Sequence, residues 1–193
     1  MIRRLLLSTA VVSTFAFAQT VYNIDPQHSS AEFSVRHMMM SNVHGEFHNL
    51  KGTVAFDPKN IKACRIDATI DVSTLDTREP QRNEHLKSPD FFDAAKFPTL
   101  EFKSTQCAKS GSKIDVHGDL TMHGVTHPVV LHMDEPAPEV KDPFGMLRRG
   151  AEATTEISRK DWGLTWNKTL DTGGVMVGDN VTITLDIEAV RKP

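Results

Sequence analysis

Histidines are the residues of this 193-residue chain whose spacing first suggests chemistry. Four of the nine lie between His117 and His132, in the segment HGDLTMHGVTHPVVLH. A structural metal site needs about four ligands that converge on one point. Strand alternation instead places His117 with Asp115 on a solvent-facing side, while His123 and His127 lie in or beside a turn. We interpret the segment as a β-hairpin with solvated histidines and predict no metal ion or other cofactor. A metal-responsive hairpin is kept as an alternative function.

Three further histidines could act as acids or bases, or could hold the polar head group of a ligand. His28 opens a strand-like run, and His37 ends that run on the face shared by Phe33 and Val35. An imidazole enclosed among apolar side chains needs a hydrogen-bond partner, which a backbone carbonyl or a ligand can supply. His85 lies in the one helical segment. A lipid-modifying enzyme that uses His28, His37 or His85 is therefore a second alternative.

The standard catalytic signatures are missing from the sequence. It contains no His-Glu-x-x-His, Gly-x-Ser-x-Gly or Cys-x-x-Cys pattern. The segment GGVMVG (173–178) lacks the Lys-Ser or Lys-Thr pair of a phosphate-binding loop. We therefore predict a protein that is not an enzyme, and we assign no catalytic residue.

The elements that must position these residues are β-strands, because apolar and polar residues alternate along much of the chain. Eight strands are predicted, over about 31–37, 43–57, 66–72, 100–107, 114–122, 127–133, 150–159 and 181–188. One short helix is predicted over 79–88, and 134–149 is expected to be a long loop near a barrel mouth. Strands with one wet face and little helix to cover the other predict an all-β sandwich or barrel. A barrel of eight strands can hold one small ligand.

The apolar face of these strands is rich in large side chains and free of charge. A further segment, DFFDAAKFP (90–98), carries three phenylalanines within seven residues. It predicts either a core plug between the helix and the next strand or an apolar gate at a barrel mouth. The residues expected to contact a ligand are therefore His28, Phe33, Val35, His37, Phe47, Phe56, Ile66, Ile70, Phe92, Phe97, Phe102, Leu120, Met122 and Leu185.

Two cysteines, Cys64 and Cys107, begin one predicted strand and end the next. Antiparallel pairing would bring them to the same barrel end, although Cys64 shares the parity of inward Ile66 and Cys107 that of outward Thr105. Strand ends often escape strict alternation through bulges. We expect a disulfide between them, which an exported protein can form.

The first 18 residues have the pattern of a secretory signal peptide. Arg3 and Arg4 precede a mostly apolar run from Leu5 to Phe17, and Ala16-Phe17-Ala18 is a small-x-small cleavage signal. A single mature domain is expected over 19–193, located in the periplasm. The net charge of −3 argues against nucleic acid as a partner, and no second apolar run is long enough to cross a bilayer.

Several blocks, in order, resemble the YceI-like family of lipid- or polyisoprenoid-binding proteins. They are YNIDPQHSSAEFSVRHM (22–38), VHGEFHNLKGTVAFD (43–57), RNEHLKSPDFFDAAKFPTLEFKS (82–104), GDLTMHGVT (118–126), and Arg159 with Trp162-Gly163. The similarity covers about 21–190. Asn83 departs from it, because the family often has an aspartate there, and the methionines of HMMMSN (37–42) could alter a pocket mouth.

The resemblance implies a lipocalin-like, eight-stranded antiparallel barrel with one short helix near an end. It also implies an internal tunnel for an amphiphile such as a polyisoprenoid, an isoprenoid quinone or a fatty-acid derivative. Dimers are common in the family, and no catalytic activity is established for it. We therefore expect a periplasmic carrier or sequestering protein for such a lipid, with transient membrane contact and a homodimer among its interactions.

Overall fold

The computed structural model describes residues 19–171 and 173–191, and the predicted signal peptide 1–18 lies outside them. Within them, short helical segments join strands that all pair antiparallel. The strands are β1 (Val21–Ile24), β2 (Ser30–His37), β3 (Ser41–Phe47), β4 (Lys51–Ala55), β5 (Arg65–Asp71), β6 (Leu75–Asp76), β7 (Thr99–Ser110), β8 (Lys113–Met122), β9 (Val125–Asp134), β10 (Val140–Lys141), β11 (Leu147–Ser158) and β12 (Val177–Arg191). The helices are α1 (Pro80–Lys87) and the 3-10 segments η1 (Ile61–Ala63), η2 (Val72–Thr74) and η3 (Arg159–Trp162).

In three places two consecutive strands together form one strand of the barrel, with an interruption between them: β1 with β2, β3 with β4, and β5 with β6. β1 and β2 both pair with β12, and β3 and β4 then pair with β2 and β1. β5 and β6 continue the pattern on β4 and β3. The remaining strands follow in chain order through β7, β8, β9 and β11 to β12, which closes the ring. The predicted all-β, eight-stranded antiparallel barrel with one short helix is confirmed.

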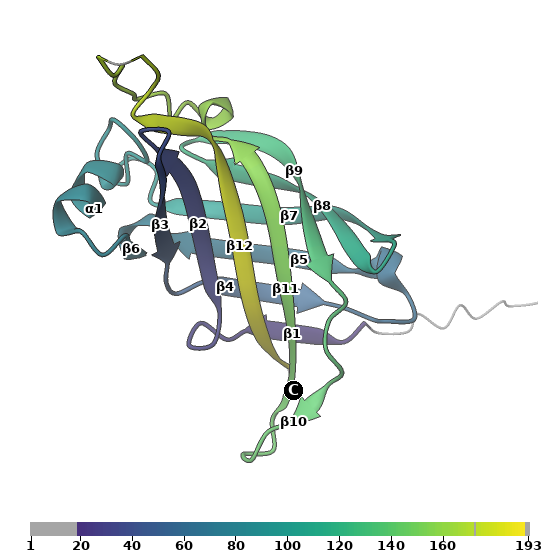
Figure 1. Ribbon diagram of the computed structural model, residues 1–193. Helices are drawn as coiled ribbons and strands as arrows, with labels where there is room; N and C mark the ends of the chain where they lie inside the picture. The colour runs from purple at the N-terminus through teal and green to yellow at the C-terminus, as the bar shows by residue number, and fades with distance from the viewer. Residues whose placement is uncertain (1–18, 172, 192–193) are drawn as a thin grey trace, which may run out of the picture.

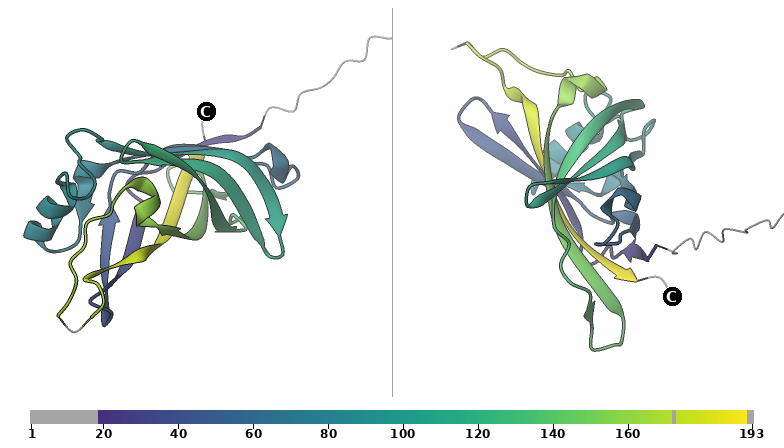
Figure 2. Two further views of the ribbon diagram at one scale, coloured as in Figure 1. Left: turned by 90° about the horizontal axis from the view of Figure 1, so that it is seen from above. Right: turned by 90° about the vertical axis from the view of Figure 1, so that its right-hand side faces the viewer.

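The barrel consists of two groups of strands that cross at a steep angle. Figure 1 shows β2, β12 and β11 running in front of β4, β5 and β7, with α1 at one side and β10 projecting below. The left view of Figure 2 also places α1 at one extremity. Closing a sheet into a barrel tilts its strands in this way, and it leaves the core between the two groups.

Two apolar clusters divide this core. The first packs against α1 and includes Phe47, Phe92 and Trp162. The second surrounds Cys64 and Cys107 at the opposite end. We call these ends of the barrel the helix end and the disulfide end.

The helix α1 is fixed by capping and by a polar anchor. The Glu79 side chain accepts from the Gln81 N–H, and Pro80 occupies the first turn, where its missing N–H costs nothing. The Asn83 side chain accepts from the Thr77 N–H (2.8 Å) and donates to the Asp76 carboxylate (3.0 Å). An aspartate could not donate this second bond, which gives the asparagine at this position a physical reason.

The weakest seam of the barrel lies between β9 and β11. They are in register only at Ala153–Met133 and Thr154–His132, whereas β8 and β9 pair along their whole lengths. Trp162 packs beside this seam: its ring lies 5.2 Å from that of His127 on β9, its Nε1 donates to the Leu120 carbonyl of β8 (3.0 Å), and its side chain is fully buried.

The predicted loop 134–149 contains a short hairpin rather than loop alone. β10 pairs with the start of β11 through Val140–Arg148 and Lys141–Leu147. Its tip exposes Phe144, which is 90% accessible to solvent. Among the described residues no helix has both the length and the apolar character that a membrane span requires.

Candidate functional site

The interior of the barrel is a cavity of about 250 Å³ with an almost wholly apolar lining. Strands from around the ring contribute to it because every second residue of each strand points inward. The cavity runs from Phe92 and Leu164 at the helix end to Tyr22 and Phe56 at the disulfide end. Elongated apolar cavities with few polar groups are typical of small-molecule sites.

Side chains in the middle of the strands show that this interior is hollow rather than packed. Phe33, Val35, Ile183 and Leu185 all line the cavity, yet each keeps part of its surface accessible. In a close-packed core such residues would be fully covered by their neighbours. The exposed apolar surface is therefore available to a ligand.

The structure brings most of the predicted ligand-contacting residues together around this cavity. Those that line it are Phe33, Val35, Phe47, Phe56, Ile66, Ile70, Phe92, Phe102, Leu120, Met122 and Leu185. Residues that line it without having been predicted include Tyr22, Leu86, Phe91, Leu100, Val129, Arg149, Ala151, Leu164, Val181, Ile183 and Ile187. The alternation of apolar and polar residues that identified Leu185 could also have identified Val181, Ile183 and Ile187. Leu164 could not be found in this way, because the residues before it show no regular alternation.

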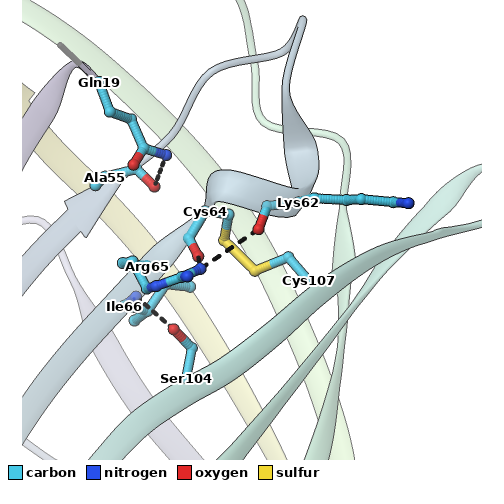
Figure 3. Close-up of a disulfide and its surroundings, with 8 residues drawn as sticks. All are labelled: Gln19, Ala55, Lys62, Cys64, Arg65, Ile66, Ser104 and Cys107. Carbon is cyan, nitrogen blue, oxygen red and sulfur yellow. Dashed lines mark hydrogen bonds between the residues drawn. A yellow bond between two sulfur atoms is a disulfide. The ribbon is translucent and has the colours of Figure 1, made fainter. Parts of the chain in front are cut away.

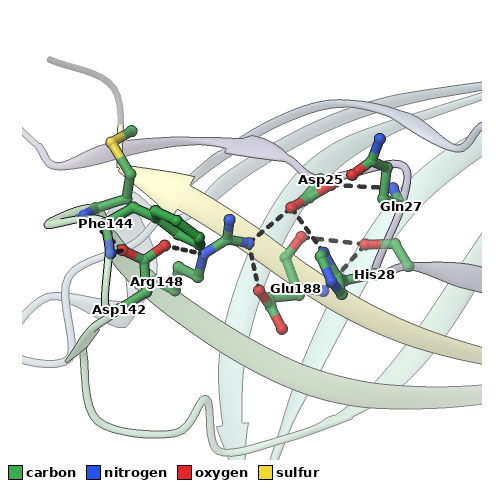
Figure 4. A network of polar contacts seen from close by, with 9 residues as sticks. Asp25, Gln27, His28, Asp142, Phe144, Arg148 and Glu188 are labelled. Carbon is green, nitrogen blue, oxygen red and sulfur yellow. Dashed lines mark hydrogen bonds and ion pairs between the residues drawn. The ribbon is translucent and has the colours of Figure 1, made fainter.

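His28, which was predicted to contact a ligand, does not line the cavity and is exposed. It occupies the turn that interrupts β1 and β2, and its Nδ1 lies 3.0 Å from Asp25 Oδ2. Arg148 joins the same group, contacting Asp25 (2.6 Å), Asp142 (2.8 Å) and Glu188 (Figure 4). The Arg148 hydrogen bond, supported by His28, lowers the pKa of Asp25 to about 2.

His37 and Phe97 are the other two predicted ligand contacts that do not line the cavity. His37 is the last residue of β2 and pairs with Ser41 at the hairpin turn, beyond Phe33 and Val35, which do line the cavity. The Phe97 ring packs 4.8 Å from the His123 ring beside the β8–β9 turn. Glycine at position 124 is required there, because an added Cβ would lie 2.4 Å from the Phe97 ring.

Aromatic rings form the wall of the cavity at the helix end. Phe92 meets Phe47 edge to face at 5.6 Å, and Phe47 meets Phe33 at 5.8 Å. Phe91 and His85 pack against Trp166, with centroids 5.2 and 4.9 Å apart. The segment 90–98 therefore contributes two rings, those of Phe91 and Phe92, to the cavity wall. His85 packs behind these rings and does not line the cavity.

Arg159 is a buried cation at this end, and the backbone consumes its hydrogen-bonding capacity. Its guanidinium donates to the carbonyls of Leu164, Trp166 (3.0 Å) and Gly178 (2.8 Å), and lies 3.5 Å from the Asp179 carboxylate. Burial lowers the pKa of Arg159, and Asp179 partly offsets this effect. The residue fixes the segment between η3 and β12 against the barrel.

The histidines of the 117–132 hairpin lie outside the cavity, and they contact different residues rather than one another. His123 Nδ1 donates to the Trp162 carbonyl (3.0 Å), the His127 ring packs on Trp162, and His132 Nδ1 lies 2.8 Å from Asp115. His117, His127 and His132 share an outer groove beside the seam. In the described part of the chain, three metal-capable side chains converge at Asp25–His28–Glu188 and at Glu46–His48–Asp76, and neither group includes a hairpin histidine.

Cys64 and Cys107 form a disulfide at the other end, with Cα atoms 5.9 Å apart (Figure 3). A bulge in β7 between Ser104 and Gln106 shifts the register and turns Cys107 inward. Both cysteines are fully buried, and Cys64 lines the cavity.

Comparison with known proteins gives this barrel a family. The model of the YceI-like domain matches residues 22–189. The chain belongs to the YceI-like family. Protein YceI of Salmonella newport is 36% identical over 161 residues, which cover 82% of this chain and 84% of that protein.

Two solved structures place this YceI-like chain among known barrels. The YceI protein of Campylobacter jejuni has a TM-score of 0.68 and 28% identity, covering 82% of this chain and 90% of the other. A polyisoprenoid binding domain from Saccharophagus degradans has a TM-score of 0.65, covering 89% and 98%. Its identity of 14% establishes a shared fold only.

Proposed function

We propose that this YceI-like protein binds an amphiphilic lipid of the isoprenoid type, such as a polyprenyl chain, an isoprenoid quinone or a fatty-acid derivative, inside the barrel. The observation that carries the proposal is the hollow apolar interior, in which Phe33, Ile183 and Leu185 keep accessible surface. The similarity in fold to a polyisoprenoid binding domain supports it.

The energetics suit a carrier or a sequestering protein. Removing one five-carbon isoprene unit from water yields roughly 4 kcal/mol before costs, at about 0.8 kcal/mol per carbon group. Ordering the lipid chain and withdrawing it from a membrane both cost free energy, and these costs cancel much of that gain. A protein that works this way can hold the lipid and still release it.

A binding role agrees better with the positions of the histidines than an enzymatic one does. His28, His37 and His85 do not line the cavity. A general base must come within hydrogen-bond reach of the proton that it removes, and an apolar chain in the barrel would not meet these side chains.

Native mass spectrometry of protein purified from cells without detergent tests the proposal. We expect a fraction of the protein to carry an additional mass that denaturation releases as an amphiphile. Protein that carries no added mass, and that also fails to take up farnesol or a ubiquinone offered in excess, would contradict it.

Export to the periplasm belongs to the proposal and rests on the sequence of residues 1–18. Cell fractionation with N-terminal sequencing should find mature protein that begins at Gln19. Recovery of full-length protein in the cytoplasm alone would contradict export. The homodimer remains a prediction, which light scattering coupled to size-exclusion chromatography can check.

Transient contact with a membrane would occur at an exposed apolar part of the surface. Met39 and Met40 of the β2–β3 turn are 60% and 71% accessible. Co-sedimentation with lipid vesicles should weaken in a Met39→Ser/Met40→Ser variant, and binding unaffected by both changes would contradict this contact.

A further inference from the structure

We infer that Arg149 is the binding site for an anionic end group of the bound amphiphile, a phosphate or a carboxylate, at the disulfide end of the cavity. This inference rests on the proposed function, because it assigns an orientation and a ligand class to a lipid that the barrel would hold.

Four charged residues contribute atoms to the cavity lining, and three of them are engaged elsewhere. Glu32 and Glu101 are exposed and alternate with inward neighbours, so their carboxylates belong to the outer surface. Arg159 is committed to backbone carbonyls. Arg149 has the inward parity of Ala151 on β11, and no carboxylate of the described residues forms an ion pair with it.

The Arg149 guanidinium lies beside aromatic rings rather than beside a counter-charge. Its central carbon lies 5.9 Å from the centroid of the Tyr22 ring and 5.7 Å from that of Phe56, both of which are buried. Rings at this distance attract a cation. The Arg149 Nε is itself buried and makes no hydrogen bond within the described chain.

The neighbouring residue, Arg148, differs from Arg149 because carboxylates of the protein pair with its charge. Arg148 points to the outer face and meets three carboxylates, Asp25, Asp142 and Glu188. Tyr22 donates its hydroxyl to Glu139 (2.7 Å), so the nearby carboxylate is already engaged by a donor. Burial and Glu139 raise the pKa of Tyr22, and Arg149 opposes them.

An anionic head group satisfies these conditions. A guanidinium offers a planar fork of donors that matches phosphate and carboxylate oxygens, and it is strongly attractive where water is scarce. From Arg149 to Ile157 the strand β11 spans about 26 Å. A ligand anchored at Arg149 would therefore extend its apolar tail along the cavity toward Phe92 at the helix end.

Calorimetric titration of delipidated protein with farnesyl phosphate and with farnesol tests the inference, because the two probes share one tail. The variants are Arg149→Gln, Arg149→Lys and, as the matched control on the opposite face of the strand, Arg148→Gln. We expect Arg149→Gln to weaken farnesyl phosphate binding roughly 10- to 100-fold, as loss of a charge-assisted contact does. Farnesol binding should change less than about threefold by the same arithmetic.

Arg149→Lys should retain part of the preference for farnesyl phosphate, and Arg148→Gln should retain all of it. Equal effects of Arg149→Gln on both probes, or no effect on either, would overturn the inference while leaving lipid binding intact. Competition by inorganic phosphate at the affinity of farnesyl phosphate would also overturn it, because the site would then hold a free anion. Failure of the wild-type protein to bind either probe would instead count against the proposed function.

Discussion

Ala151 offers a direct way to distinguish a hollow barrel from a packed one. It lies on β11 opposite Ile187 of β12, lines the cavity and keeps accessible surface. The substitution Ala151→Phe would place a phenyl ring in the cavity. A cavity of about 150 Å³ accommodates one benzene molecule, so the ring would fill more than half of the available 250 Å³.

The two descriptions predict different effects on stability and binding. In a packed core, added carbons force neighbours out of place and cost about 1–3 kcal/mol. In a hollow barrel, we expect the free energy of unfolding to stay within about 1 kcal/mol of wild type, because the ring occupies empty space. The displaced volume corresponds to about one isoprene unit, whose burial is worth roughly 4 kcal/mol before costs.

Farnesol affinity should therefore fall at least tenfold, with an upper limit of about a thousandfold for the full 4 kcal/mol. Urea denaturation and a titration of intrinsic fluorescence measure the two quantities. Glu152→Phe is the control, because Glu152 is exposed on the opposite face of the same strand. Destabilisation of 1–3 kcal/mol by Ala151→Phe with unchanged farnesol affinity would refute the reasoning.

Three further predictions concern the supports of the cavity. Replacing both Cys64 and Cys107 by alanine should lower the free energy of unfolding by about 4 kcal/mol, since the disulfide closes a separation of 43 residues; urea midpoints that match those of the oxidised wild type would contradict this. Asp25→Asn should cost up to about 2 kcal/mol near neutral pH, where the carboxylate is ionised. Because the folded pKa of about 2 lies below the ordinary value of 3.8, this stability is present above pH 4 and is lost as the pH falls through 2, so the wild type and variant should converge in acid unfolding curves; a constant difference would contradict it. Arg159→Met should cost about 3 kcal/mol or more by leaving buried carbonyls unpaired, and should speed hydrogen exchange at 164–171 and 173–178; unchanged exchange would show that Arg159 does not hold this segment.

The ring of strands could be predicted from the sequence because alternation is a local property. Leu120 and Met122 share a parity, and both line the cavity as that parity requires. Parity failed where a bulge intervened. Cys107 shares the sequence parity of Thr105, and the register shift in β7 reverses it.

Residues placed by turns or by tertiary contacts could not be found in this way. His28 precedes a regular strand, but the turn that interrupts β1 and β2 directs it toward Asp25. Arg149 has inward parity, yet a charged residue is not expected among apolar ones unless its environment is known. Trp162 and Leu164 are buried by tertiary contacts of η3 and the segment that follows it, which has no period of its own.

Photo-crosslinking with a diazirine-bearing farnesol, read out by peptide mass spectrometry, tests most directly whether the inside of the barrel holds the lipid. Strand β12 distinguishes binding inside the barrel from binding outside it, because Ile183 and Leu185 line the cavity while Thr182 and Thr184 alternate to the other face. We predict adducts at Ile183 or Leu185 that excess farnesol suppresses. Adducts confined to Thr182, Thr184 or other outward residues would contradict the account.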